Sequence, residues 1–157
     1  MGTKKILLLG GYGNTGRPLA RLILQETQVS LVLAGRNKAK AEAGARELNQ
    51  AWEGERVEGR QVDASDPSSL KPALEGIEMV VVASSTAKYA RGVAQCIMEA
   101  GSDYFDIQYS QAKIVALKSL AGELEKSGRC FITDGGFHPG LPAALVRYAA
   151  TFCDSRS

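Results

Sequence analysis

Near its N-terminus the chain reads Ile6-Leu7-Leu8-Leu9-Gly10-Gly11-Tyr12-Gly13-Asn14-Thr15-Gly16-Arg17-Pro18, an aliphatic run that leads directly into closely spaced glycines. A run this short and apolar is typical of a buried strand. The glycines permit backbone angles that are closed to other residues, and Pro18 fits the first turn of a helix. The segment therefore predicts a strand, a glycine loop and a helix in immediate succession.

The glycine loop contains two overlapping spacings, Gly11-x-Gly13-x-x-Gly16 and Gly10-x-x-Gly13-x-x-Gly16. Such a loop leaves backbone N–H groups at the positive end of a helix dipole, where they can bind the diphosphate of a dinucleotide. Because the loop follows a strand and opens an amphipathic helix, we favour a cofactor site over a purely structural turn. No Lys-Ser or Lys-Thr follows the glycines, which excludes a Walker-type loop. The predicted cofactor-binding residues of the loop are Gly10, Gly11, Tyr12, Gly13, Asn14, Thr15 and Gly16.

Strands and helices alternate along the rest of the chain. Further strands are predicted at residues 29–33, 79–83, 104–107 and 130–133, and residues 57–62 can form another. Helical patterns end near residue 25 and cover residues 38–48, 70–74, 89–100, 111–126 and 141–152, with Gly101 and Gly128 as caps. This alternation predicts an α/β fold of the Rossmann type, a doubly wound parallel sheet of about six strands in the order 3-2-1-4-5-6, with helices on both faces.

Length and composition indicate a single globular domain. The chain has 157 residues, of which 45% are hydrophobic and 23% charged. No apolar run approaches the roughly 20 residues of a membrane span, and no signal peptide is expected. The net charge of +2 is spread along the chain, which gives no reason to expect nucleic acid or membrane as a partner. We expect a cytoplasmic protein that acts on a small-molecule substrate; a homodimer through the last strand or the last helix stays open.

The cysteines and the histidine indicate neither a metal site nor a disulfide framework. Cys96, Cys130 and Cys153 are odd in number and far apart, so we expect reduced and mostly buried thiols. His138 is the one histidine, too few for a metal cluster or a histidine-based triad. His138 is a candidate general acid because its ordinary pKa lies near neutrality, although a loop histidine before proline is more often a turn residue. No metal site is predicted, and no catalytic residue is assigned.

The end of the second strand favours NADP over NAD as the cofactor. NAD-binding folds carry an acidic residue there, whereas this chain has Ala34-Gly35-Arg36-Asn37. The Arg36 guanidinium can bind a 2′-phosphate through two charge-assisted hydrogen bonds, and Lys38 can add a further charge. In the alternative, Arg36 is solvated or stacks on the adenine. We predict that Ala34, Gly35, Arg36 and Asn37 contact the cofactor.

Polar residues after the third and fourth strands complete the predicted site. Asp63 is placed to meet the adenine edge, although a turn role in Asp63-Ala64-Ser65-Asp66 is equally compatible with the sequence. Ser84, Ser85 and Thr86 follow the fourth strand. Ligands of open α/β sheets bind beyond the carboxyl ends of the strands, so these hydroxyls should lie near the diphosphate or the nicotinamide ribose. Alternatively, they cap the following helix.

Over nearly all its length the chain resembles the N-terminal NAD(P)-binding domain of the saccharopine dehydrogenase family. The resemblance is carried by the glycine loop, by Leu33-Ala34-Gly35-Arg36-Asn37, by Ala100-Gly101-Ser102-Asp103-Tyr104-Phe105-Asp106-Ile107 and by Gly135-Gly136-Phe137-His138-Pro139-Gly140-Leu141-Pro142. It implies an oxidoreductase that transfers hydride between nicotinamide and an imine or amino-acid substrate. Members of that family are usually more than twice as long, so the resemblance implies the cofactor domain of a two-domain enzyme, which by itself binds the cofactor without turnover.

Two other interpretations stay open at this point. Tyr109-Ser110-Gln111-Ala112-Lys113 matches the Tyr-x-x-x-Lys pair of short-chain dehydrogenases, but Tyr109 follows the fifth strand too closely for the helix that carries that pair, and we favour a chance match. Asp106, Gln108 and Tyr109 are expected near the cleft without an assigned role. From another functional class, the chain could be a non-catalytic module that senses NADP.

Overall fold

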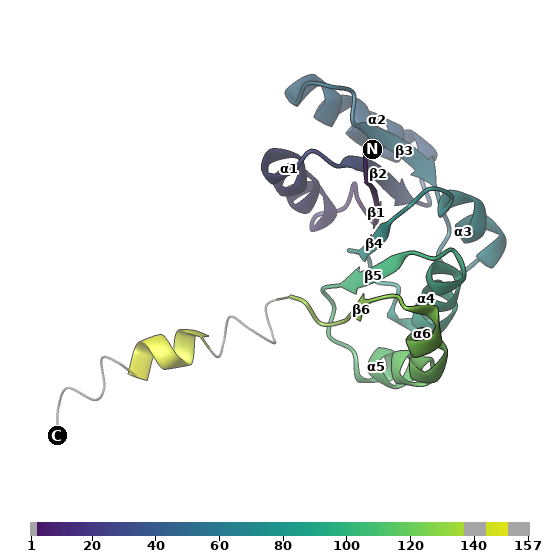
Figure 1. Ribbon diagram of the computed structural model, residues 1–157. Coiled ribbons are helices and arrows are strands. Elements are labelled where there is room, and N and C mark those ends of the chain that lie inside the picture. Colours follow the sequence, from purple (N-terminus) through teal and green to yellow (C-terminus); the bar gives the residue numbers. More distant parts are fainter. Residues whose placement is uncertain (1–2, 137–143, 151–157) are drawn as a thin grey trace.

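The computed structural model describes residues 3–136 and 144–150. Its centre is a six-stranded sheet in the order β3-β2-β1-β4-β5-β6, in which every neighbouring pair is parallel (Figure 1). The strands are β1 (Lys5–Leu9), β2 (Ser30–Gly35), β3 (Val57–Gln61), β4 (Met79–Val82), β5 (Asp103–Asp106) and β6 (Phe131–Ile132). The doubly wound order predicted from the sequence is therefore confirmed. The order reverses between β1 and β4, where Leu9 pairs with Val82, and a crevice is expected beyond these two strands.

Helices connect the strands and cover both faces of the sheet. They are α1 (Gly16–Glu26), α2 (Lys38–Ala51), α3 (Pro67–Ala73), the short 3₁₀ helix η1 (Ala87–Tyr89), α4 (Ala90–Glu99), α5 (Gln111–Lys118) and α6 (Ala121–Ser127). Residues 144–150 form a further, exposed helical turn within the expected last helix. None of the helices in the described ranges has the length and the apolar run needed to cross a bilayer.

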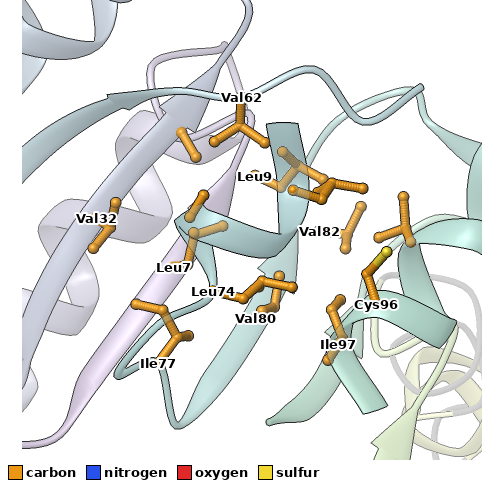
Figure 2. Packing of buried hydrophobic residues seen from close by; sticks show 14 of the residues in the cluster. Leu7, Leu9, Val32, Val62, Leu74, Ile77, Val80, Val82, Cys96 and Ile97 are labelled. Atoms are coloured by element: carbon orange, nitrogen blue, oxygen red, sulfur yellow. The ribbon is translucent and has the colours of Figure 1, made fainter. Parts of the chain in front are cut away.

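Alternating side chains of the strands build two cores, one on each face of the sheet. Leu7 and Leu9 of β1 pack with residues of α3 and α4, and the sticks of Figure 2 show this cluster. Leu8, which lies between them in the sequence, packs on the opposite face with Leu24 of α1 and Leu48 of α2. A strand that is buried on both faces needs a continuous apolar run, which explains the sequence of β1.

The C-terminal third differs from the sequence prediction in several details. The single helix predicted over residues 111–126 is wrong, because α5 and α6 are separate helices on either side of Ser119 and Leu120. Leu120 is buried, with 1% of its surface exposed, and its N–H bonds to the Leu117 carbonyl in a tighter turn that ends α5. The helix predicted from residue 89 begins instead with η1, and β6 is shorter than residues 130–133. Gly128 caps α6 with a φ of 64°, as predicted.

The cysteines follow the prediction only in part. Cys96 is buried on α4, and burial raises the pKa of its thiol. Cys130 is exposed, so the expectation of burial is wrong for this residue. It precedes β6, a short strand at the edge of the sheet. Cys153 lies outside the described residues.

Candidate functional site

A cleft of about 500 Å³ opens at the carboxyl ends of the central strands. Its walls come from the turns after β1, β2, β3 and β4, which meet there because all these strands are parallel. Most of the predicted site residues line it: Gly10, Tyr12, Gly13, Gly35, Arg36, Asp63, Ser84, Ser85 and Thr86. The other predicted residues do not line the cleft and lie in or next to the same turns: Gly11, Asn14, Thr15, Gly16, Ala34 and Asn37.

The glycine loop folds so tightly that side chains are excluded at two positions. Gly10 has a φ of 90°, and an added Cβ would lie 2.7 Å from the Cβ of Ser84. A Cβ on Gly16 would lie 2.2 Å from the carbonyl oxygen of Gly10. The Gly10 amide donates to the carbonyl of Ala34 over 2.7 Å, which ties the loop to β2. Backbone thus forms the wall of the cleft at the junction of β1 and α1.

The N-terminus of α1 carries amides that have no acceptor among the described residues. The Gly13 amide bonds to the Gly10 carbonyl and the Arg17 amide to the Gly13 carbonyl, at 2.9 and 3.0 Å. The amides of Asn14, Thr15 and Gly16 find no acceptor within the described ranges. The Thr15 side chain does not cap the helix, and its first turn contains no acidic residue. The positive end of the helix dipole therefore lacks an anion of its own, as in helices that bind phosphate.

Tyr12 connects the glycine loop to the turn after β2. Its hydroxyl accepts a hydrogen bond of 3.0 Å from the Asn37 amide. An added Cβ on Gly35 would lie only 2.6 Å from the same hydroxyl oxygen, so the ring occupies the space that a side chain at residue 35 would need. Asn37 in turn caps α2 by accepting from the Lys40 amide over 2.9 Å. These contacts fix the backbone on both sides of Arg36.

Arg36 brings a positive charge to the end of β2. Its side chain is exposed and lines the cleft, and its guanidinium forms no ion pair with any described residue. Lys38, the other predicted cation, is outside the cleft wall and pairs with Glu42 at 3.8 Å. Of the two, only Arg36 is free to meet an anion in the cleft.

Asp63 is a turn residue that also lines the cleft. Its carboxylate accepts from the amide and the hydroxyl of Ser65, at 2.9 and 2.7 Å. These two hydrogen bonds, aided by the charge of Arg36, hold the pKa of Asp63 below its ordinary value. Asp63 therefore has the turn role considered from the sequence, and it also forms part of the cleft wall.

The segment after β4 carries an unsatisfied hydroxyl. The Ser84 Oγ is buried and has no hydrogen-bond partner among the described residues. Thr86 donates to the Ser84 carbonyl over 3.3 Å and makes no side-chain cap, so the alternative that these hydroxyls cap the next helix is wrong. Burying a hydroxyl without a partner costs about 1 to 3 kcal/mol. A bound ligand with a polar group at this place would remove that cost.

Seven further residues line the cleft and are absent from the sequence prediction: Leu9, Val62, Ala64, Ser65, Ala83, Lys88 and Tyr89. The ammonium group of Lys88 lies 4.7 Å from the centre of the Tyr89 ring, a cation–π contact. Both residues belong to η1, which directly follows Ser84, Ser85 and Thr86. Lys88 and Tyr89 could have been found from their position shortly after the buried strand β4. They were missed because the sequence predicted that a helix starts at residue 89.

A buried cluster of charges lies at the ends of β5 and β6. Lys113 and Asp106 form an ion pair with side chains only 2% and 1% exposed, and Asp134 lies 3.0 Å from the same ammonium group. Asp106 also accepts from the hydroxyls of Tyr104 and Thr133, at 2.7 and 2.9 Å. Burial alone would raise the pKa of Asp106, but the bonds from Lys113, Tyr104 and Thr133 hold it below its ordinary value. Asp106, expected near the cleft, is therefore an internal residue.

The same cluster bears on the Tyr-x-x-x-Lys match. Lys113 is buried against two carboxylates, whereas Tyr109 lies before α5 and is 65% exposed. Ser110, between them, is the N-cap of α5 and accepts from the Lys113 amide over 3.3 Å. The two side chains do not share one helix, which supports the interpretation as a chance match. His138 lies outside the described residues, and within those residues no group of three or more metal-ligating side chains occurs.

An open parallel sheet, a glycine loop between β1 and α1, and a cleft at the reversal of strand order together define a dinucleotide-binding domain of the Rossmann type. Residues 6–129 match the sequence model of the saccharopine dehydrogenase NADP binding domain, and the chain belongs to this family.

Solved structures share the fold. Apo saccharopine dehydrogenase (L-Glu forming) of Saccharomyces cerevisiae is 22% identical with a TM-score of 0.74; the match covers 96% of this chain and 31% of that enzyme. The NADPH-dependent quinone oxidoreductase of Escherichia coli, complexed with NADPH, is 21% identical with a TM-score of 0.60, over 82% of this chain and 47% of that one. Triphenylmethane reductase of Citrobacter sp., complexed with NADP(H), is 20% identical with a TM-score of 0.59. The match covers 82% of this chain and 48% of that enzyme. The chain thus spans less than half the length of each of these enzymes.

Proposed function

We propose that this chain binds NADP(H) in the cleft and is the cofactor domain of a saccharopine dehydrogenase-like oxidoreductase. The observation that carries the proposal is the set of unpartnered amides of Asn14, Thr15 and Gly16 at the start of α1, beside a wall of bare backbone. Such amides bind a diphosphate through direct hydrogen bonds and the helix dipole. When bound, the nicotinamide supplies the hydride chemistry, and the protein supplies binding and orientation.

The residues of the cleft fit this group. A side chain at Gly10 or Gly16 would collide with the loop itself, so the approach to the amides depends on glycine. The buried Ser84 hydroxyl, which has no partner in the described part of the protein, gains one from a polar atom of the coenzyme. Tyr12 and Asn37 hold the turn that presents Arg36. Each of these features has a use when a dinucleotide lies across the cleft.

We further propose that Arg36 selects NADP over NAD. The position at the end of β2 carries a cation where NAD-binding folds carry a carboxylate. Because the guanidinium is exposed and forms no ion pair within the described ranges, it is available for a 2′-phosphate. Lys38 is engaged with Glu42, so the proposal depends on Arg36.

For the substrate, the proposal names only a chemical class. Membership of the family and the structural match to saccharopine dehydrogenase support an imine or amino-acid substrate and hydride exchange with nicotinamide. Because the chain covers 31% of that enzyme, we propose that further protein, in a second domain, holds the substrate. Turnover then requires both parts, while the chain described here binds the coenzyme.

Calorimetric titration with NADPH and NADH tests the proposal. We expect the wild-type chain to bind NADPH more tightly than NADH. Arg36→Glu should weaken NADPH at least about tenfold and NADH much less, since a charge-assisted contact worth about 1.5 to 3 kcal/mol becomes a repulsion. Arg46→Glu is the matched control, because Arg46 is exposed on α2 outside the cleft wall. Equal losses for both coenzymes would contradict the role of Arg36, and no binding of either would overturn the proposed function.

A further inference from the structure

Gln108 lies between the buried charge cluster and the cleft. Its side-chain Nε2 donates to the Ser85 Oγ over 3.5 Å, and Ser85 lines the cleft. Its own backbone is held on both sides, because the Gln108 amide donates to Asp106 Oδ1 over 3.1 Å and its carbonyl accepts from Lys113 Nζ. A continuous set of contacts thus runs from the cluster to a hydroxyl of the proposed coenzyme site.

The buried charge cluster joins β5 and β6 at a cost in desolvation free energy. Burying an ammonium group with two carboxylates costs several kcal/mol per ion in lost hydration, and apolar residues of similar size often stabilise a protein as well or better. Apolar residues, however, cannot hold a backbone amide and carbonyl in fixed directions. Asp106 and Lys113 do this for Gln108, so the cluster orients the start of the loop that precedes α5.

The direction of the bond determines what Ser85 can do. A carboxamide Nε2 is a donor only, so in its contact with Gln108 the Ser85 oxygen accepts. The hydroxyl proton is then left to donate to another atom, and the oxygens of a coenzyme, on its phosphates or ribose, are acceptors. The contact is long for a side-chain hydrogen bond, at 3.5 Å.

We infer that Gln108 is a positioning residue, which fixes the Ser85 hydroxyl as a hydrogen-bond donor to the oxygens of the bound dinucleotide. Asp106 and Lys113 hold Gln108 in place. The inference rests on the proposed function, because it requires that the coenzyme occupy the cleft. It assigns a use to the buried ion cluster, although neither Asp106 nor Lys113 lines the cleft itself.

A double-mutant cycle tests this inference in the chain as it stands. NADPH affinity is measured by calorimetry for wild type, Ser85→Ala, Gln108→Ala and the double variant, with thermal unfolding of each. We expect each single variant to weaken NADPH about 3- to 10-fold, the range of one net hydrogen bond. The double variant should be no weaker than Ser85→Ala alone, since Gln108 acts only through the Ser85 hydroxyl. Gln111→Ala, an exposed glutamine nearby on α5, should bind like wild type.

Gln108→Glu gives a readout that a merely structural role would not change. A carboxylate accepts the Ser85 proton and so removes the donor from the coenzyme, so this variant should bind NADPH more weakly than Gln108→Ala while unfolding at the same temperature. Additive losses in the cycle, or wild-type affinity in either single variant, would overturn the inference alone. Failure of the wild-type chain to bind NADPH would instead overturn the proposed function, and this inference with it.

Discussion

Gly16 and Gly92 show how differently two glycines of this chain are used. At Gly16, the first residue of α1, an added Cβ would lie 2.2 Å from the Gly10 carbonyl oxygen, a distance that real atoms do not adopt. At Gly92, within α4, nothing lies within 4 Å of an added Cβ. Glycine is therefore required by packing at the first position and only tolerated at the second. The requirement falls at the start of α1, shortly after Gly13, which lines the cleft.

The substitution Gly16→Ala should damage folding and coenzyme binding together. The methyl group forces the loop apart, at a cost of about 1 to 3 kcal/mol in the free energy of unfolding. It also moves the amides of Asn14 and Thr15, so NADPH binding should weaken at least tenfold. Gly92→Ala should raise stability by about 0.5 to 1 kcal/mol, because alanine favours a helix over glycine. Urea denaturation and calorimetry measure both effects; wild-type affinity in Gly16→Ala would contradict the account of the loop.

Much of the site could be predicted from single residues because its signals are local. The glycine spacing, Arg36 after β2 and the hydroxyls after β4 all lie directly after apolar runs, and parallel strands bring such turns together. The contact between Tyr12 and Asn37 could not be predicted, because it joins residues that are 25 positions apart and depends on how the loop folds. Lys88 was missed for a similar reason, since it lies on a short 3₁₀ helix without a sequence pattern of its own.

At the scale of elements, the ends of β5 and β6 are joined by ionic and hydrogen bonds as well as by the sheet. β6 contributes only two residues to the ladder, and Asp134, which follows it, has a φ of 58° in the left-handed region. The bonds from Lys113 to Asp106 and Asp134 hold that turn against β5 and α5. Tyr104 of β5 completes the cluster through its bond to Asp106, and its ring stacks on Phe131 of β6 with centroids 5.2 Å apart.

Tyr104 should make the protein less stable in alkaline solution. Burial, followed by the hydrogen bond to Asp106, raises the pKa of its phenol well above the ordinary value. The unfolded chain then releases this proton near pH 10, while the folded protein keeps it. Its contribution to stability is complete below pH 10 and is lost as the pH rises through the folded pKa. Tyr104→Phe keeps the ring but removes this proton and the bond.

We expect Tyr104→Phe to lower the free energy of unfolding by about 1.5 to 3 kcal/mol at pH 7, as for a hydrogen bond to a charged group. The difference from wild type should shrink as the pH rises above about 10, because only wild type carries the titrating phenol. Urea denaturation of both proteins between pH 7 and 11 measures this difference. A constant difference over that range would show that Tyr104 ionises alike in both states, and a growing one that folding lowers its pKa; either result contradicts the prediction.

At the scale of the whole molecule, the strand order could be predicted because the central strands β1, β2 and β4 are short apolar runs and a helical pattern lies in each connection between strands. The order β3-β2-β1-β4-β5-β6 then follows from general rules of open α/β sheets. The break between α5 and α6 could not be predicted in this way, because neither glycine nor proline stands at Ser119 and Leu120, where the chain makes its tighter turn. The exposure of Cys130 likewise depends on β6 being the edge of the sheet.

The most direct test of the account is the ¹H–¹⁵N spectrum of the chain titrated with NADPH. If the diphosphate binds to the start of α1, the amide signals of Asn14, Thr15 and Gly16 should shift the most. Amides of Gly92 and Gly122, which lie on helices that do not line the cleft, should stay in place. Unchanged loop amides at saturating NADPH, or shifts confined to residues outside the cleft, would contradict the central claim that this loop holds the coenzyme.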